Sequence, residues 1–320
     1  MKYHRGLLFW GIALITGGAV ALAVQQGYLD QDVLAGTWRL WPLILVAIGA
    51  SILLSRTPFA IVGTIVAGLV VGAAGGALIA VGPGVAACGG TDPTNLATER
   101  GTFGEAARVS LDFNCGNLDL STTDDAKWSV ASARVGGNPA RVTSGSDHLD
   151  VESSQGSRWW GGGGRERVIV DLPKGTSYRL EITPNAADTT IDLDGGHLTS
   201  VSLHPNAGSV RLILSDTEVD KLDLSLNAGS AVILIGARTS MDATMSVNAG
   251  SLEVCTETGV ALQVTVDPNI TFSTNLDESG LTQTGDTWST DGYAEATDRV
   301  HIDLEGNAAS FTLNPEGGCE

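Results

Sequence analysis

Three aspartates, Asp188, Asp192 and Asp194, lie close together in this sequence and are side chains that could perform acid–base chemistry. A pair of carboxyl groups can cleave a glycosidic bond, one acting as general acid and the other as base or nucleophile. The surrounding residues alternate between apolar and polar, which is typical of a strand and sends Asp192 and Asp194 outward as solvated charges. We therefore expect no catalytic residue, and a carbohydrate-active β-helix enzyme is kept only as the last alternative.

The histidines also lack a pattern typical of a reactive or metal site. None has a cysteine or histidine neighbour at the spacing of metal ligands, and the sequence contains no phosphate-binding loop, dinucleotide-binding motif or nucleophile elbow. The five histidines are His4, His148, His197, His204 and His301. We expect the protein to bind no cofactor and no metal.

A short phrase containing asparagine recurs along the C-terminal part of the chain. "PNAADTTIDL", "HPNAGSVRLIL", "LNAGSAVILI" and "VNAGSLEV" follow one another with their asparagines 21 residues apart, and two further copies lie at irregular spacing. The repeated asparagines are Asn114, Asn185, Asn206, Asn227, Asn248 and Asn307. Apolar residues alternate with period two before and after each of them, which predicts two strands joined by a tight corner.

Such a two-strand unit is too small to bury its apolar face alone, so the units must stack on one another. Asparagine tolerates left-handed backbone, and the Ala-Gly or Ala-Ala that follows it leaves room for a sharp bend. Stacking also brings equivalent asparagines within reach of side-chain amide hydrogen bonds, about 4.8 Å apart. The fold class predicted for residues 103–314 is therefore all-β, a β-solenoid-like stack of repeats of about 21 residues. Irregular units are expected to cap its ends. A polar binding row along the corners is the alternative role for the asparagines.

The four cysteines are compatible with disulfides, because their number is even and the domain is expected to be exported. If the units stack in chain order, Cys115 and Cys255 lie several layers apart, beyond the limit of about 7 Å between bridged Cα atoms. This favours a Cys255–Cys319 bridge, with Cys88–Cys115 as a second pair. Four free thiols remain an alternative. "VAAC" at 85–88 leaves lipidation of Cys88 open as well.

The first 87 residues have the composition of a membrane domain rather than of a signal peptide. Three segments, at about 6–24, 38–54 and 59–82, are apolar and long enough to cross a bilayer, which takes about 17–25 residues. We expect an all-α domain of three transmembrane helices over 1–87. A linker at 88–102 and a tail at 315–320 flank the β-domain.

The charges that flank these segments predict the orientation. Lys2, Arg5 and Arg56 favour the cytoplasmic side, against the single dissenting Arg39. Three crossings then leave the β-domain extracytoplasmic, in a multi-pass protein of the plasma membrane.

Two local motifs have more than one interpretation. The third apolar segment contains Gly68, Gly72 and Gly76, a spacing that lets helices approach closely, either within the chain or between two copies. "WWGGGG" at 159–164 is expected to form a flexible loop. Its Trp159 and Trp160 are either partly covered or in contact with a membrane surface or a partner.

The net charge narrows the range of partners. The whole chain carries −18, and four basic against two acidic residues in 1–87 leave −20 on residues 88–320. Such a domain repels nucleic acids and anionic lipid and attracts cations. We therefore expect no nucleic-acid binding.

Two parts of the chain resemble known families. "FWGIALITGGAVAL" followed by "RLWPLILVAIGASILL", with Trp41-Pro42 and Gly49, resembles the LiaF-type transmembrane region over about 5–56. The strand ending in "LPKG" at 172–175, followed by glycine-containing units about 20 residues apart, resembles the DUF4097-like toast-rack families of candidate adhesins over about 103–314. This chain departs from them in its four cysteines and its acidity. The LiaF-type resemblance also stops short of that family's own C-terminal domain.

These resemblances imply a membrane-anchored bacterial cell-envelope protein, linked in some relatives to two-component signalling under envelope stress. No catalytic residues carry over. We expect a non-catalytic protein whose β-domain binds or senses at the membrane-proximal surface, with a protein partner in envelope signalling. The alternative is a structural or adhesive protein that self-associates through the edges of its solenoid.

Overall fold

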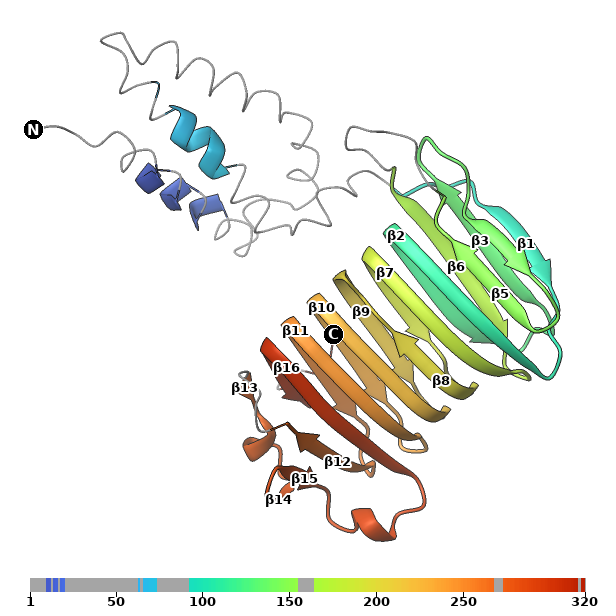
Figure 1. Ribbon diagram of the computed structural model, residues 1–320. Helices are drawn as coiled ribbons and strands as arrows, with labels where there is room; N and C mark the ends of the chain where they lie inside the picture. The colour runs from blue at the N-terminus through green and yellow to red at the C-terminus, as the bar shows by residue number, and fades with distance from the viewer. Residues whose placement is uncertain are drawn as a thin grey trace, which may run out of the picture. The chain divides into compact units, whose positions relative to one another are not determined.

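The computed structural model describes residues 10–12, 14–16, 18–20, 63, 66–73, 92–154, 164–267, 273–315 and 318–319. The chain divides into two compact units, Met1–Thr91 with Arg158–Gly163, and Asp92–Ser157 with Gly164–Glu320. The second unit holds every strand described below, and Figure 1 labels most of them.

The prediction of three transmembrane helices is wrong for the part of the chain that the structure describes. Residues 10–12, 14–16, 18–20, 63 and 66–73 are helical, and no described helix is long and apolar enough to cross a membrane. The predicted segment at 38–54 lies outside the described residues. The prediction rested on the length and apolarity of the three segments alone.

The second unit is all-β. Two short 3-10 helices, η2 (Leu276–Glu278) and η3 (Tyr293–Glu295), interrupt its strands. The strands are β1 (Ala97–Gly101), β2 (Ala106–Thr123), β3 (Trp128–Arg134), β4 (Arg141–Ser144), β5 (His148–Glu152), β6 (Glu166–Pro173), β7 (Ser177–Asp192), β8 (His197–Leu203), β9 (Ala207–Leu214), β10 (Glu218–Ile235), β11 (Ser240–Thr256), β12 (Ala261–Val266), β13 (Ser273–Thr274), β14 (Thr282–Thr284), β15 (Thr287–Ser289) and β16 (Arg299–Leu313).

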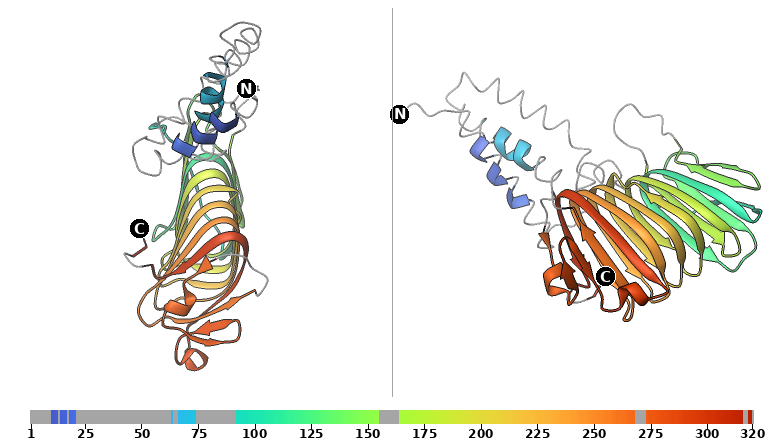
Figure 2. Two further views of the ribbon diagram at one scale, coloured as in Figure 1. Left: turned by 90° about the vertical axis from the view of Figure 1, so that its left-hand side faces the viewer. Right: turned by 60° about the horizontal axis from the view of Figure 1, so that its bottom comes forward.

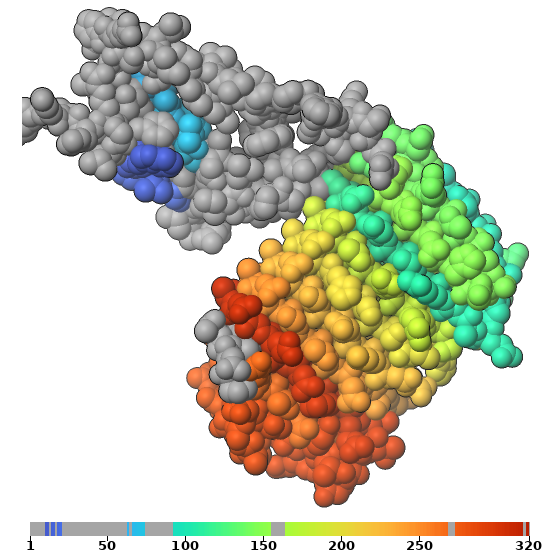
Figure 3. Space-filling model, in the orientation of Figure 1, coloured from blue at the N-terminus to red at the C-terminus, as the bar shows by residue number. Residues whose placement is uncertain are grey.

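Each repeat forms one rung, which runs along one layer, bends at its asparagine and returns along a second layer. β10 and β11 pass through the bend as single strands, and β8 and β9 are the two separate halves of another rung. β8 pairs with the first half of β10 and β9 with its second half, both in parallel. Figures 1 and 2 show the rungs side by side, and Figure 3 shows them as successive bands of surface.

The rungs enclose one apolar core, because alternate residues of both layers point inward. Leu203, Leu224 and Met245 come from first halves of rungs, and Leu212 and Ile233 from second halves, and all are buried in the same cluster. β10 and β11 stay in register around the bend, with Leu226 opposite Val247 and Ala228 opposite Ala249. The 21-residue period of the sequence is therefore the length of one rung.

The spatial order departs from chain order at both ends of the stack. β2 lies between β7 on one side and β5 with β6 on the other, so the chain steps outward after β2 and then returns. At the opposite end, β16 lies between β11 and β12, although β12 precedes it by more than 30 residues. The two irregular intervals between asparagines correspond to these outward steps.

Antiparallel strands close both ends of the stack. β1 pairs with β3 and β3 with β6 at one end, and β12, β15 and β14 follow one another at the other. β1 lies inside 88–102, so the prediction of a linker there is wrong. The sequence of β1 has no alternation of apolar and polar residues, because four of its five residues are exposed. Short, exposed edge strands limit pairing with other chains.

The bend brings neighbouring rungs into close contact at glycine. Gly208, Gly229 and Gly250 have φ of 115°, 123° and 136°, in the left-handed region that favours glycine. A Cβ on Gly229 would overlap the carbonyl oxygen of Gly208 in the preceding rung. Glycine is therefore required at the bend for two reasons: it adopts the positive φ, and it has no Cβ to clash with the neighbouring rung.

We expect Gly229→Ala to destabilise the β-stack strongly, because it combines a disfavoured φ with a clash against backbone. The loss should be on the order of 3 kcal/mol, measured as the shift in chemical unfolding of the full-length protein. Gly104→Ala is the matched control, since a Cβ there would meet its nearest atom, the Ser146 oxygen, at 3.6 Å. Equal losses for the two variants would contradict this account of the bend.

Candidate functional site

The six repeated asparagines form one hydrogen-bonded row along the bends of the stack. Each Nδ2 donates to the Oδ1 of the preceding asparagine: Asn185 to Asn114 (3.1 Å), Asn206 to Asn185 (2.6 Å), Asn227 to Asn206 (2.8 Å), Asn248 to Asn227 (3.0 Å) and Asn307 to Asn248 (3.2 Å). Parallel, in-register pairing places identical side chains one above another, which is why the amides meet. The side chains lie at the surface of the stack rather than in its core.

A second polar row runs beside the first. Three residues after each asparagine comes Asn117, Asp188, Ser209, Ser230, Ser251 or Ser310, each in register with the next. The Ser209 hydroxyl donates to Asp188 Oδ1 at 2.7 Å. Alanine and glycine separate the two rows in every rung except that of Asn114, where Cys115 and Gly116 do so. We call these two rows together the corner edge.

An arginine cluster closes the N-terminal end of the corner edge. Arg165 Nε donates to Asp92 Oδ1 at 2.5 Å, and its Nη2 donates to Asn117 Oδ1 at 2.7 Å. Asn117 Nδ2 in turn donates to Asp92 Oδ2 at 2.9 Å, and Asp188 Oδ2 lies 3.6 Å from the guanidinium. Asn117 and Asp188 belong to the second polar row, so their contacts with Arg165 hold this end of the row in one arrangement.

Glu166 is a buried carboxylate next to this cluster, at the start of β6. Its side chain is 1% exposed, and neither carboxylate oxygen has a hydrogen-bond partner of normal geometry. Burial raises the pKa of the Glu166 carboxyl, against weaker opposing effects from Ser153 and the positive charge of Arg134. Burying a carboxylate without a full set of partners is costly, and this cost raises the pKa.

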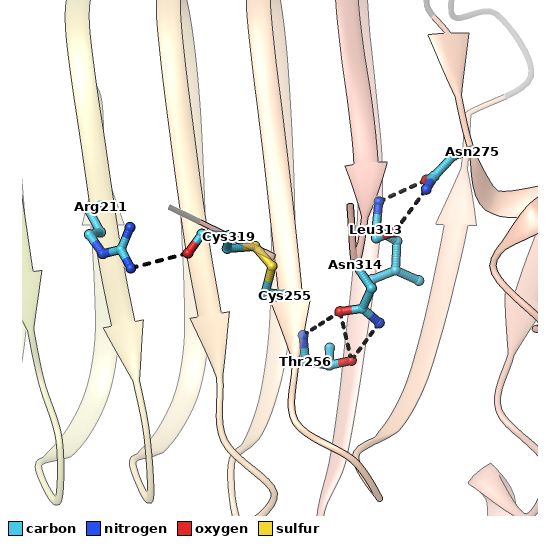
Figure 4. The surroundings of a disulfide bond; sticks show 7 residues. All are labelled: Arg211, Cys255, Thr256, Asn275, Leu313, Asn314 and Cys319. Atoms are coloured by element: carbon cyan, nitrogen blue, oxygen red, sulfur yellow. Dashed lines mark hydrogen bonds between the residues drawn. A yellow bond between two sulfur atoms is a disulfide. The ribbon is translucent and has the colours of Figure 1, made fainter. Parts of the chain in front are cut away.

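The outward side of the second layer carries an apolar patch and the end of the chain. Ile213, Val232 and Leu234 point outward from neighbouring rungs and are only partly exposed. Leu234 is in register with Cys255, which forms a disulfide with Cys319. Figure 4 shows Cys319 and its neighbours.

The three aspartates that were considered for acid–base chemistry, Asp188, Asp192 and Asp194, have different neighbours. Asp188 faces the corner edge, Asp192 Oδ1 accepts from the backbone N–H of Asp194 at 3.2 Å, and Asp194 Oδ2 lies 3.7 Å from Lys174 Nζ. Each carboxylate therefore has a separate local role in the fold.

The histidines have separate acidic neighbours as well. His197 lies 3.0 Å from Glu218, and His301 lies 3.6 Å from Asp242 and 3.4 Å from Asp303. Within the described ranges, no group of His, Cys, Asp or Glu side chains has an arrangement that could hold a metal ion.

Some predicted site residues fall outside the described part of the chain: Trp159, Trp160, Gly76 and Cys88. Gly68 and Gly72 lie buried in the helical stretch at 66–73. Cys115 is disulfide-bonded, in addition to the Cys255–Cys319 bridge.

The sequence analysis missed Arg165, Glu166 and the apolar patch. A signal for Glu166 was present, because it alternates in phase with the buried residues Val168, Val170 and Leu172. Arg165 had no such signal, since its partners Asp92 and Asn117 are distant in the chain.

Two family models match the chain in succession. Residues 8–53 match the LiaI-LiaF-like transmembrane region, and residues 95–236 match the N-terminal domain of toast_rack, DUF2154. The chain thus carries a LiaI-LiaF-like region, which indicates a membrane protein, followed by a toast-rack domain. Among curated proteins none matches.

Solved structures of candidate adhesins also match. A candidate cell adhesion protein from Clostridium sporogenes is 11% identical, with 68% of this chain and 98% of that chain covered and a TM-score of 0.45. A candidate adhesin from Bacteroides fragilis is 10% identical, with 70% and 100% covered and a TM-score of 0.27. At these TM-scores the likeness carries no argument about function.

We expect Asn227→Ala to cost more stability than Asn114→Ala. Asn227 hydrogen-bonds to an asparagine on each side, whereas Asn114 ends the row with one such bond. With roughly 0.5–1.5 kcal/mol per hydrogen bond, the interior variant should lose about twice as much free energy of unfolding. Equal and negligible losses would show that the row does not stabilise the stack.

We expect Glu166→Gln to stabilise the protein at neutral pH, by on the order of 1 kcal/mol. The pKa of the Glu166 carboxyl group is raised in the folded state. The contribution of this group to the free energy of unfolding is therefore fully present below its unfolded-state pKa. It is lost as the pH rises through the folded-state pKa. Unfolding free energies measured from pH 4 upward should therefore fall more steeply in the wild type than in the variant. Glu181→Gln, at an exposed position, is the control, although it also loses a surface ion pair with Arg108. Parallel pH profiles for wild type and Glu166→Gln would contradict the argument.

Proposed function

We propose that this protein is a non-catalytic, membrane-anchored component of the bacterial cell envelope, whose toast-rack domain binds or senses on the extracytoplasmic side. The observation that carries the proposal is the order of its parts: a LiaI-LiaF-like transmembrane region precedes a regular β-stack. A stack of in-register rungs presents an extended, rigid surface, and this form suits recognition of a partner. An accessory role in envelope-stress signalling is consistent with the LiaF-like part.

A binding role agrees with the distribution of reactive side chains. Catalysis needs an acid, base or nucleophile whose side chains converge on one point. Asp188, Asp192 and Asp194 instead engage different neighbours, and His197 and His301 sit in separate surface pairs. Nothing in this arrangement favours the carbohydrate-active enzyme.

The disulfides support an extracytoplasmic location for the β-domain. Cys255 is bonded to Cys319, and Cys115 is disulfide-bonded as well. Structural disulfides persist outside the cytoplasm and are rare within it, where thiols are kept reduced.

The charge of the stack favours a cationic partner. Residues 181–320 contain 22 acidic and four basic residues, so most of the negative charge of the chain lies in the C-terminal half of the stack. Long-range attraction would raise the local concentration of cationic peptides or proteins, and salt would weaken it. A cationic peptide or basic protein of the envelope is thus the proposed class of partner.

Self-association through open edges receives less support. Antiparallel strands close both ends, and β14 spans only three residues, all of them exposed. β1 presents Glu99 and Arg100, charges that oppose pairing between identical edges.

Thiol labelling of intact cells tests the location. A membrane-impermeant maleimide should not label the protein until an impermeant reductant opens the disulfides, and should then label Cys255 and Cys319. A variant with both Cys255→Ser and Cys319→Ser should lose this reduction-dependent signal at the C-terminal peptide. Labelling that occurs only after lysis, with or without reductant, would place the domain in the cytoplasm and overturn the proposal.

A further inference from the structure

Three serines of the second polar row have no hydrogen-bond partner for their hydroxyl groups among the described residues. Ser230, Ser251 and Ser310 follow one another in register and are partly exposed. Ser209, one rung earlier, donates to the Asp188 carboxylate. The hydroxyls of the three serines therefore add no bond between rungs, and each is able to donate one hydrogen bond and to accept others.

The asparagines beside them are fixed in place and keep part of their bonding capacity. A primary amide has two N–H donors and two lone pairs on its oxygen. In Asn206, Asn227 and Asn248 the row uses one N–H and one lone pair of each amide. One donor and one acceptor per amide are left for a ligand. Because the amides hold one another, a ligand that bonds to them has little side-chain freedom to remove.

Four successive rungs carry the same kind of uncharged residues at the bend. The segments are Asn-Ala-Gly-Ser at 206–209, 227–230 and 248–251 and Asn-Ala-Ala-Ser at 307–310, and we call them together the neutral strip. They belong to consecutive rungs, whose second halves lie in β9, β10, β11 and β16 (Figure 1).

The charge around the neutral strip favours an uncharged ligand. Residues 181–320, which include the strip, contain 22 acidic and four basic residues. This negative charge repels anionic polymers. The strip itself has no carboxylate with which to pair a cation, so a cationic group bound on it would lose water without gaining a partner of opposite charge.

The size of the neutral strip favours a slender ligand over a folded protein. Four rungs about 4.8 Å apart, with four residues of about 3.3 Å in each, give a face of about 19 Å by about 13 Å. Its area of about 250 Å² is a third of the roughly 800 Å² that each partner contributes to a standard protein–protein interface. Neither a globular partner nor a second copy of this chain would be held by the strip alone.

The spacing of the rungs distinguishes between linear polymers. An extended peptide advances by about 3.3 Å per residue, so its polar groups lose register with rungs about 4.8 Å apart after the first contact. Each sugar of an extended β-1,4-linked chain advances by close to one rung spacing. Such a chain presents a hydroxyl or an acetamide group to each rung in turn, and the contacts add along the strip.

We propose that the neutral strip binds an uncharged β-1,4-linked glycan, with successive sugars on successive rungs. The asparagine amides and the serine hydroxyls hydrogen-bond to the hydroxyl or acetamide groups of the sugars, and no covalent bond changes. This site differs from the acidic surface proposed for a cationic partner. It depends on the proposed function only for the presence of the domain in the envelope.

Titration of the full-length protein in lipid nanodiscs, followed by saturation-transfer difference NMR, tests the site against empty nanodiscs. The probes are chitotetraose, whose sugars carry acetamide groups, and cellotetraose, whose sugars carry hydroxyl groups alone. Binding of either tetrasaccharide is expected, and the comparison identifies the group that the strip prefers.

The dependence of affinity on chain length and on salt tests the geometry and the chemistry of the strip. Affinity should rise about tenfold from the disaccharide to the tetrasaccharide, as two further hydrogen bonds form. It should level off at the hexasaccharide, because the strip consists of four rungs. Raising the salt concentration should leave the affinity unchanged, in contrast to the binding of a cationic partner.

A pair of serine substitutions separates binding from folding. Ser230→Ala combined with Ser251→Ala removes two hydroxyls that bond to no described residue, so the affinity should fall about tenfold while chemical unfolding stays unchanged. Ser202→Ala combined with Thr244→Ala is the matched control. Both of these side chains lie on the outward side of the first layer, four residues before the asparagine of their rung, and this variant should bind like the wild type.

Failure of both tetrasaccharides to bind would overturn the proposal, as would equal affinities for the disaccharide and the tetrasaccharide. So would full affinity in the Ser230→Ala/Ser251→Ala variant, or a lower free energy of unfolding, because the hydroxyls would then hold the stack together. Equally tight binding of a neutral Gly-Ser repeat peptide would point to an extended peptide instead. None of these outcomes bears on the side of the membrane on which the domain lies, which the thiol labelling decides.

Discussion

Close stacking of rungs at the asparagine bend is the constraint on which the rest of this structure depends. A single rung has two apolar faces and no way to bury them, so each rung is stable only against its neighbours. At the bend the backbones approach so closely that Gly229 leaves no room for a Cβ against Gly208. The same closeness aligns the side chains of Asn206, Asn227 and Asn248 into a hydrogen-bonded row. The bend and the core thus impose one register on the whole stack.

A stack built in this way has two ends, and both are made differently from its middle. The chain places β5 and β6 beyond β2, and β12 beyond β16, before it returns to fill the inner position. The outermost strands are then antiparallel and short, which leaves little edge for another chain to extend. The regular middle consequently offers its outer surfaces, rather than its ends, for recognition.

Those outer surfaces differ from one another in chemistry. The corner edge is polar, and its asparagines are hydrogen-bonded to one another. The second layer carries Ile213, Val232 and Leu234 on its outward side, beside Arg211 and Glu253. Binding by this domain would therefore use charge over the acidic C-terminal half. Salt would weaken such binding.

Periodicity in the sequence determined the rung, because side-chain alternation and the 21-residue interval are local properties of the chain. The expectation of left-handed backbone at the asparagines was wrong, because in these bends the positive φ lies at Gly208, Gly229 and Gly250, which have no Cβ to oppose it. Only the tertiary structure decided that β16 enters between β11 and β12 and that Arg165 meets Asp92 and Asn117. These features join residues far apart in the chain, and no local pattern specifies such pairings. The prediction of three transmembrane helices rested on length and apolarity, which measure a preference for lipid. The described residues include no helix that could span a membrane.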